Sequence, residues 1–204
     1  IDNMCGICGF TGQVLDRSKT IKNMTEVITH RGPDSEGFYS DDFINMGFRR
    51  LSIIDVEEGH QPIYNEDKTL VLTFNGEIYN YRDLRAELIE LGHTFYTETD
   101  SEVLIHAFEE WKEDMLMKLR GMFGFAIYNT KDKSVFVARD FFGIKPMHYT
   151  TVGDNFIYAS EIKSILEFPT FEKKFTVNNK KIVELSHQPA IAEEHVEDSQ
   201  LSPN

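Results

Sequence analysis

Two cysteines near the start of the chain are the residues whose type and spacing most directly suggest chemistry. Cys5 and Cys8 form a Cys-x-x-Cys pair, which is typical of redox dithiols and of half of a zinc site. A redox pair usually follows a strand and opens a helix, but only four residues precede Cys5. A structural zinc needs two more closely spaced ligands, and the seven histidines form no H-x₃₋₅-H pair. We therefore predict no metal site, and we interpret Cys8 as a small buried hydrophobic residue.

Cys5 differs from Cys8 because it directly follows a methionine, Met4. If Met4 is the initiator and is removed, Cys5 carries both a thiol and a free α-amino group. The reference pKa of such an amine, about 7.7 to 8.0, suits a general base at neutral pH. The nucleophile and its base would then belong to one residue.

Three further polar sites have a structural interpretation when each is considered alone. Asn75-Gly76 ends an apolar run and is typical of a hairpin turn. Asp100 is a plausible helix N-cap, and Arg50, one of an arginine pair, is typical of a solvated surface charge. The dipeptide and the single residues alone do not indicate a function.

Several sequence blocks occur together and in a recognisable order. They are MCGI at 4–7, HRGPDS at 30–35, RLSIID at 50–55, NGEIYN at 75–80 and TDSE at 99–102. The chain resembles the class II glutamine amidotransferase (glutaminase) domain of the glutamine-hydrolysing asparagine synthetases over about residues 4–168. Blocks at 121–126, 138–140, 142–146 and 159–163 extend the match. RGPDS together with NGEIYN points to this branch rather than to the glucosamine-6-phosphate or purine-pathway amidotransferases.

The resemblance implies a role for each part of an amide hydrolysis. Cys5 would attack the glutamine carboxamide, and its own amine would take the thiol proton and pass one to departing ammonia. A γ-glutamyl thioester would remain for water. The Asn75 side-chain amide and the Gly76 backbone N–H would form the oxyanion hole.

The same resemblance implies which residues bind the substrate. Arg50 would hold the α-carboxylate of glutamine in a bidentate pair. Asp100 and Glu77 would bind its α-ammonium group, and the residues that would line the pocket are Leu51, Ile53 and Ile54.

Hydrophobic patterning predicts the elements that must position these residues. Alternating or apolar runs predict strands at 4–10, 43–54, 70–74, 123–128, 135–139, 147–152 and 156–159. Helical spacing predicts helices at 18–30, from Asn80 to Leu91, after Thr99 or Asp100, and at 161–168. Strands grouped around helices without regular βαβ alternation predict an α+β fold. The resemblance specifies a four-layer αββα sandwich of the N-terminal-nucleophile hydrolase type.

The chain divides into one domain and two terminal segments. Residues 1–3 are interpreted as a remnant of a cleaved tag, 4–180 as the glutaminase domain, and 181–204 as an acidic, mobile tail. The SGGxDS phosphate-binding loop of the family's synthetase domain does not occur in this sequence. ATP and Mg²⁺ are therefore expected only for that absent domain, and no cofactor is expected here. Phe141 stands where the family usually has a basic residue, so an altered contact with the synthetase domain is expected.

Composition limits the partners. With 34 Asp and Glu against 21 Lys and Arg, the formal net charge is −13, which opposes binding to nucleic acid. The sequence has no apolar stretch of about 18 residues, so a membrane is not expected, and two cysteines fit the reducing cytoplasm. The expected partners are L-glutamine and the synthetase (ATP-pyrophosphatase) domain, and a homodimer remains open.

The residues before Cys5 bear on activity. In the printed chain, residues 1–3 and Met4 acylate the amine that should act as the base, so this form is expected to be inactive. The alternative to a glutaminase is a catalytically silent module that binds glutamine or contacts another domain.

Overall fold

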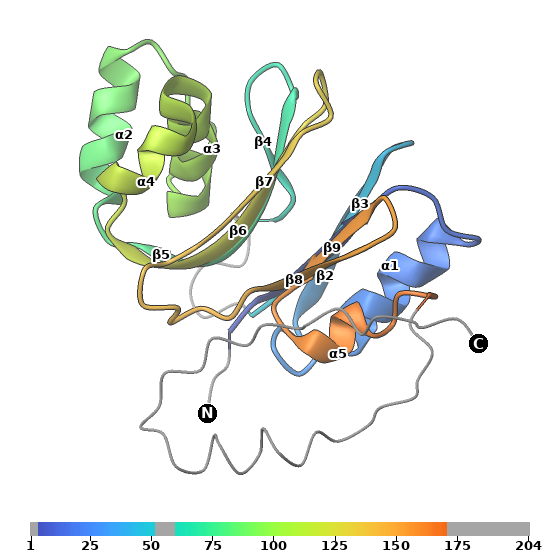
Figure 1. The fold of residues 1–204 in the computed structure, drawn as a ribbon. Helices are drawn as coiled ribbons and strands as arrows, with labels where there is room; N and C mark the ends of the chain where they lie inside the picture. The colour runs from blue at the N-terminus through green and yellow to red at the C-terminus, as the bar shows by residue number, and fades with distance from the viewer. Residues whose placement is uncertain (1–3, 52–59, 171–204) are drawn as a thin grey trace, which may run out of the picture. The chain divides into compact units, whose positions relative to one another are not determined.

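Two antiparallel sheets lie face to face in the computed structural model, which describes residues 4–51 and 60–170 (Figure 1). The first sheet has the strand order β2-β3-β1-β9-β8, and the second has the order β4-β5-β6-β7. The predictions made for residues 1–3, for Ile53 and Ile54, and for the tail at 181–204 lie outside the described residues.

The strands of each sheet come from separate parts of the chain. The first sheet consists of β1 (Gly6–Thr11), β2 (Ser35–Ser40), β3 (Ile44–Arg50), β8 (His148–Val152) and β9 (Asn155–Ala159). The second consists of β4 (Ile63–Tyr64), β5 (Leu70–Ile78), β6 (Gly121–Asn129) and β7 (Val135–Arg139). The strands predicted at 123–128 and 135–139 form the hairpin β6–β7, and those predicted at 147–152 and 156–159 form the hairpin β8–β9.

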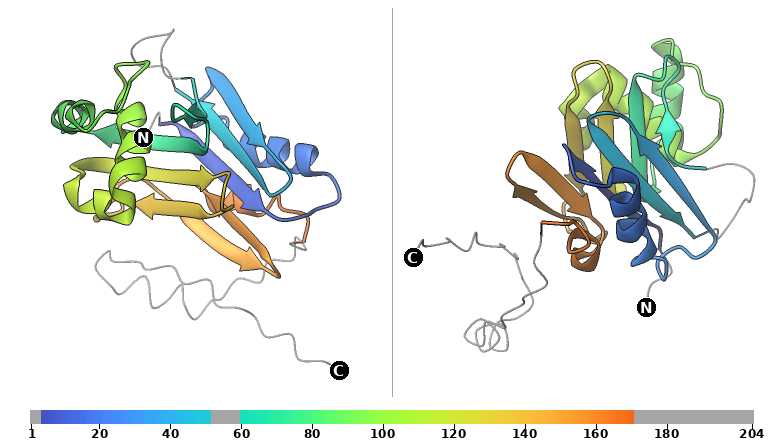
Figure 2. Two further views of the ribbon diagram at one scale, coloured as in Figure 1. Left: turned by 90° about the horizontal axis from the view of Figure 1, so that it is seen from above. Right: turned by 90° about the vertical axis from the view of Figure 1, so that its right-hand side faces the viewer.

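Helices cover the outer face of each sheet. The first sheet is covered by α1 (Arg17–Glu26) and α5 (Ile162–Ile165), which Figure 2 shows from two further directions. The second is covered by α2 (Tyr81–Glu90), α3 (Asp100–Trp111) and α4 (Met115–Lys118), with a 3₁₀ turn at Lys112–Asp114. The predicted four-layer αββα sandwich is therefore confirmed. None of the helices in the described ranges is both long and apolar enough to cross a membrane.

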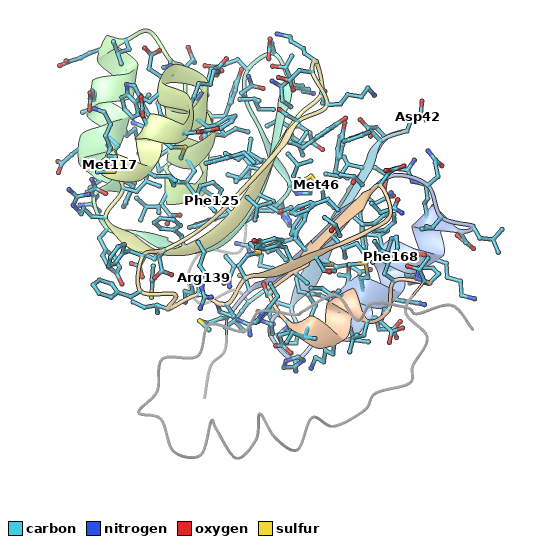
Figure 3. All side chains as sticks on the ribbon, in the orientation of Figure 1. Asp42, Met46, Met117, Phe125, Arg139 and Phe168 are labelled. Carbon is cyan, nitrogen blue, oxygen red and sulfur yellow. The ribbon has the colours of Figure 1, made fainter. Side chains whose placement is uncertain are left out.

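Among the described residues, three hydrophobic clusters fill the spaces between these layers. Figure 3 labels one residue of each: Phe125 between the second sheet and its helices, Met46 between the sheets, and Phe168 beside α1 and α5. All three side chains are fully or almost fully buried. A closed core on both faces of each sheet holds the strand ends in fixed positions.

Alternation along β5 determines which way its polar residues point. Leu72 and Phe74 pack under the helices of the second sheet, whereas Val71 packs between the two sheets. Because successive side chains in a strand point to opposite faces, Asn75 lies on the same face as Val71. Asn75 is therefore directed toward the space between the sheets.

The same alternation directs Cys5 to that space from the first sheet. Ile7 on β1 belongs to the cluster between the sheets, and Cys5 packs against this cluster. Cys8 and Phe10 belong instead to the cluster under α1. Cys8 is completely buried, as its interpretation as a small hydrophobic residue predicted.

The residues at the helix ends act as caps at some ends and not at others. Thr99 accepts a hydrogen bond from the Glu102 N–H, so of the two predicted caps of α3 Thr99 is the one used. Gly92 has φ +102° after α2, as a left-handed C-terminal cap requires. Asn80 occupies the N-cap position of α2 without capping it, because its amide bonds the Lys118 carbonyl and the Arg120 N–H.

The turn interpretation of Asn75-Gly76 is wrong. Both residues lie inside β5, where Asn75 pairs with Gly124 and Gly76 with Phe123 of β6. The strand that was predicted for 70–74 therefore continues to Ile78. Pairing along the whole length of β6 overrides the local turn preference of the Asn-Gly dipeptide.

Other boundaries also differ from the prediction. The helix predicted for 18–30 ends at Glu26, and the strand predicted for 43–54 ends at Arg50. The strands β2 and β4 were not predicted. The segment SEGFYS of β2 is rich in serine and glycine and only partly buried, so its strand structure depends on pairing with β3.

Two neighbouring residues of α2 test the packing of the second sheet and its helices. Leu88 is 0% exposed and Ile89 is 47% exposed. Leu88→Ala is expected to lower the free energy of unfolding by about 2–5 kcal/mol, since it removes buried methyl groups and leaves a cavity. Ile89→Ala, the matched control, should change it by less than about 1 kcal/mol. Urea denaturation followed by circular dichroism measures both, and equal losses would contradict this packing.

Candidate active site

Cys5 lies immediately before β1, with its thiol against the end of β3. The Leu51 N–H donates to Cys5 Sγ at 3.5 Å, and the Leu51 carbonyl lies 4.0 Å from the same sulfur. Burial raises the pKa of the Cys5 thiol, although the Leu51 hydrogen bond and the positive charges of Arg50 and Lys145 act in the opposite direction. Three of the predicted site residues, Cys5, Arg50 and Leu51, are thus brought together.

The backbone of Cys5 is held by a buried arginine. Arg31 Nε donates to the Cys5 carbonyl at 3.1 Å, and Arg31 Nη1 donates to Glu161 Oε1 at 3.0 Å. Burial opposes ionisation of Glu161, but hydrogen bonds from Lys163, Arg31 and His30 outweigh it and lower its pKa to about 2. Glu161 is therefore ionised at neutral pH and fixes the guanidinium beside Cys5.

Ser160 fixes the strand that follows Cys5. Ser160 Oγ accepts from the Ile7 N–H at 3.0 Å, and the Ser160 N–H donates to the Ile7 carbonyl at 2.8 Å. Two neighbouring residues of the sequence block at 159–163 therefore restrain the start of the chain. Ser160 bonds Ile7 of β1, and Glu161 holds the arginine that bonds Cys5.

Gly32 in the RGPDS block allows the chain to approach the end of β3. A Cβ atom at this position would lie 2.5–2.6 Å from backbone atoms of Arg49 and Arg50. Any side chain there would displace the strand end that carries Arg50, which explains why the block has glycine at this position.

Asn75 supplies a buried donor toward the space between the sheets. The residue is 2% exposed, and its Nδ2 finds no hydrogen-bond partner in the described part of the chain. A buried amide donor without a partner is costly, so such an atom needs a role beyond packing. An incoming oxyanion would satisfy it.

The backbone N–H of Gly76 points to an open edge of β5. On the same strand, the Phe74 N–H donates to Gln61 Oε1 and the Ile78 N–H donates to Asp100 Oδ2. Alternate residues of a strand direct their N–H groups to the same side, so the Gly76 N–H lies between these two. In the described residues, β4 pairs with β5 only at Val71 and Leu72 and does not cover this edge.

Gly76 is also confined by its neighbours. A Cβ atom at this position would lie 2.2 Å from the Met122 carbonyl oxygen. Only glycine fits, so the neighbourhood of Asn75 is built around a close approach of two backbones.

Two carboxylates stand at the same end of the second sheet. Asp100, at the start of α3, accepts the Ile78 N–H at 2.9 Å, and Glu77 is exposed. Burial raises the pKa of the Asp100 carboxyl, and the nearby negative charge of Glu77 raises it further. A bound cationic group would stabilise both ionised carboxylates.

Lys145 connects the two halves of the site, although it was not among the predicted site residues. Its pKa is lowered by burial and by the charge of Arg31, while Cys5 and Glu77 act in the opposite direction. Glu77 in turn acts on Asp100. The structure therefore places Cys5, Lys145, Glu77 and Asp100 within electrostatic reach of one another.

The loop that carries Lys145 is fixed by Asp140. The Asp140 carboxylate accepts the backbone N–H groups of Phe123, Ile144 and Lys145, at 3.2, 2.9 and 2.9 Å. The sequence signal for this arrangement was present in the blocks at 138–140 and 142–146. The block at 30–35 held the signal for Arg31.

Comparison with known proteins places the chain in a family. The family described as "Glutamine amidotransferase domain" matches residues 4–198. Asparagine synthetase (glutamine-hydrolyzing) 1 of Bacillus subtilis (strain 168) is 50% identical over 168 residues, which are 78% of this chain and 27% of that protein. Asparagine synthetase (glutamine-hydrolyzing) of Zea mays is 41% identical over 166 residues, 79% of this chain and 28% of that protein.

Solved structures show the same fold. The glutamine phosphoribosylpyrophosphate amidotransferase from B. subtilis, complexed with ADP and GMP, superposes with a TM-score of 0.67 at 22% identity, covering 79% of this chain and 43% of that one. This likeness supports the fold of two facing sheets covered by helices.

The chain belongs to the glutamine amidotransferase domain family, a family of enzymes. Its similar curated relatives are glutamine-hydrolysing asparagine synthetases, and the chain spans less than a third of their length.

The two thiols of the printed chain should differ in reactivity. Since burial raises the pKa of Cys5, less thiolate exists at pH 7.5 than in a free cysteine, whose pKa is about 8.5. Alkylation of Cys5 by iodoacetamide, followed by mass spectrometry, should still accelerate above pH 8.5. Cys8, with its pKa raised to about 11 by complete burial, should stay unmodified until the protein unfolds. A Cys5 rate that levels off below pH 8 would contradict this description.

Proposed function

We propose that this chain is the glutaminase domain of a glutamine-hydrolysing asparagine synthetase. It would hydrolyse L-glutamine to L-glutamate and ammonia, and the ammonia would serve the ATP-dependent amidation of aspartate on a synthetase domain. The observation that carries the proposal is the buried, unpartnered amide donor of Asn75, directed to the same inter-sheet space as Cys5. That arrangement pairs a nucleophile with a donor for the oxyanion it creates.

The reaction begins with Cys5 as the first residue of the chain. Its α-amine takes the thiol proton, and the sulfur attacks the carboxamide carbon of glutamine. The tetrahedral intermediate collapses as the C–N bond breaks, and the amine returns the proton to the leaving nitrogen, releasing ammonia. Water, deprotonated by the same amine, then attacks the γ-glutamyl thioester and releases glutamate and the thiol.

Two donors are proposed for the oxyanion. The Asn75 Nδ2 has no other partner in the described residues, and the Gly76 N–H points to the uncovered edge of β5. Donors that are fixed before the reaction stabilise the developing charge without reorganising.

Charge is separated across the proposed pocket in the way a free amino acid requires. The positive side contains Arg31, Arg50 and Lys145 near Cys5, and the negative side contains Asp100 and Glu77. We assign Arg50 to the α-carboxylate of glutamine and the two carboxylates to its α-ammonium group. The backbone of Leu51, against the thiol, would limit the pocket, and Ile53 and Ile54 remain predicted wall residues.

The synthetase domain is proposed as the partner, with ATP and Mg²⁺ bound there and no cofactor needed for the thiol chemistry. Phe141, Phe142 and Ile144 project into solvent on the loop that also carries Lys145. We propose this apolar loop as the docking surface, since it would connect the partner domain directly to the active site. A free-thiol nucleophile also supports a cytoplasmic location, because that compartment keeps thiols reduced.

The amine base is tested with two forms of the chain. A form that begins at Cys5 is expected to release ammonia from L-glutamine, whereas the printed form, with Cys5 acylated, should not. Ammonia release is measured with a coupled glutamate dehydrogenase assay, with Cys5→Ala as the control. Activity of material shown by intact mass to begin at Ile1 would refute the role of the free amine.

Glutamine binding separates the enzyme from the silent-module alternative. If neither form turns over but glutamine raises the melting temperature of both, the chain binds substrate without hydrolysing it alone. If glutamine neither binds nor reacts, the glutaminase proposal fails for this chain.

Asn75→Ala should separate catalysis from stability. Asn75 Nδ2 has no hydrogen bond to lose in the described residues. The melting temperature should therefore fall only as far as the lost packing contacts of the side chain require. In the chain that begins at Cys5, kcat should fall by about 10²- to 10³-fold, as for other oxyanion-hole donors. A fall in kcat of less than about five-fold would show that Asn75 does not bind the oxyanion.

A further inference from the structure

A cluster of histidine and glutamate side chains lies outside the glutaminase site, between α3 and the neighbouring loops. Glu66 comes from the turn between β4 and β5, His93 follows α2, and His106 and Glu109 lie on α3. One ligand atom from each of the four residues lies within 4.8 Å of all the others. The strand β4 and the helix α3 that bring them together are adjacent in Figure 1.

His106 is the most unusual member of the cluster. Its side chain is 0% exposed, and within the described ranges neither ring nitrogen has a hydrogen-bond partner. Glu109 Oε2, which faces it, is also buried without a partner. Buried polar atoms are normally paired, so this group of atoms requires another explanation.

The separations between these atoms are too long for hydrogen bonds. Nδ1 of His106 lies 3.4 Å from Glu66 Oε2 and 3.7 Å from Glu109 Oε2, and Nδ1 of His93 lies 3.8 Å from oxygens of the same two carboxylates. Hydrogen bonds of this kind measure about 2.7–3.2 Å. Ligands bonded to one tetrahedral Zn²⁺ at about 2.0–2.2 Å stand about 3.3–3.6 Å apart, which is close to the observed separations.

The outer atoms of both imidazoles face carboxylates. His106 Nε2 lies 3.6 Å from Glu102 Oε1, and His93 Nε2 lies 3.3 Å from Glu110 Oε2. In metal sites a carboxylate commonly accepts the outer N–H of a ligating imidazole, which orients the inner nitrogen toward the metal. The His93–Glu110 pair has this contact, whereas Glu102 faces His106 Nε2 without forming a hydrogen bond. Both histidines of the cluster therefore have Nδ1 directed inward.

The outer oxygens of the two inner carboxylates are also held. Glu66 Oε1 accepts the Thr94 N–H at 3.1 Å, and Glu109 Oε1 accepts from Asn65 Nδ2 at 3.2 Å. Glu109 is thereby oriented with Oε2 toward both imidazoles, whereas Glu66 turns Oε2 toward His106 and keeps Oε1 3.8 Å from His93 Nδ1. Two neutral imidazoles and two carboxylates carry a charge of −2, which a divalent cation neutralises.

We propose that Glu66, His93, His106 and Glu109 form a binding site for a structural Zn²⁺ ion. Two imidazole ligands disfavour Mg²⁺ and Ca²⁺, and two nitrogen with two oxygen ligands in this spacing suit tetrahedral zinc. Four protein ligands close the coordination shell, so the ion would stabilise structure rather than activate water. It would tie the β4–β5 turn, the segment after α2 and the helix α3 together.

The site is accessible from solvent on its carboxylate side. Glu66 and Glu109 are about one-third exposed, and His93 is 11% exposed. A groove with a volume of about 560 Å³, lined in part by Glu66 and Glu102, opens beside the cluster. A metal ion can therefore reach the site without unfolding of α3.

Zinc binding is measured on the 204-residue chain after treatment with a chelator. Titration with ZnCl₂ against a chromophoric competitor at pH 7.5 should give one Zn²⁺ per chain. His93→Gln and Glu66→Gln should each weaken zinc binding at least ten-fold. Glu102→Gln alters the carboxylate that faces His106 Nε2 and should weaken zinc binding by about 10- to 100-fold. Co²⁺ at the same site should give the visible absorption of tetrahedral coordination.

His148→Gln is the matched control, since His148 lies on β8 of the other sheet and should leave zinc affinity unchanged. Glu66→Gln is isosteric and partly exposed, so it tests the site even if a histidine variant fails to fold, which circular dichroism will show. The proposal is overturned if zinc does not bind, or if it binds equally to the wild type, Glu66→Gln and His93→Gln. Protonated imidazoles paired with the carboxylates would then account for the cluster. Because Cys5 and Asn75 are unchanged in all these variants, the outcome is independent of the glutaminase assay.

Discussion

The position of the nucleophile depends on β1 being hydrogen-bonded along both edges. Cys8 in this strand pairs with Gly47 of β3 on one side and with Ala159 of β9 on the other. A strand in the centre of a sheet cannot shift its register without breaking both ladders. The residue just before it, Cys5, is therefore fixed by the whole first sheet, and the Arg31 guanidinium extends that restraint by one more hydrogen bond to its carbonyl.

Sequence alone predicted the elements whose pattern is local. The β6–β7 hairpin and α3 were found because alternation and a capping threonine are visible in a short window. The strand β2 and the C-terminal part of β5, after Phe74, were missed. Segments rich in Ser and Gly, or containing Asn-Gly, become strands only through pairing with a partner that is distant in sequence. The blocks indicated Cys5 and Asn75, whereas the contribution of Lys145 became visible only in the structure, where the segment between β7 and β8 carries it within electrostatic reach of Cys5.

Burial disfavours the charged form of one titratable side chain on each side of the proposed site. Asp100 has its pKa raised and Lys145 has its pKa lowered, and for both groups burial is the main cause. Each charged form is therefore less stable than it would be in water. A zwitterion that supplies an ammonium to Asp100 and a carboxylate to the positive side would relieve both penalties. This complementarity favours a free amino acid over a glutamine side chain within a polypeptide, which lacks both charged ends.

The helix α3 belongs to both proposed sites. Its first residue, Asp100, accepts the Ile78 N–H of β5. Two residues later, in the same first turn, the Glu102 carboxylate accepts the N–H groups of Tyr96 and Thr97 while facing His106. A cation bound by His106 would hold Glu102, and through it the segment that leads into α3. Because a helix moves as a rigid unit, fixing its second turn also restricts the carboxylate at its start. The zinc cluster would thus set how precisely Asp100 is positioned for the α-ammonium group, while taking no part in the bond-breaking steps.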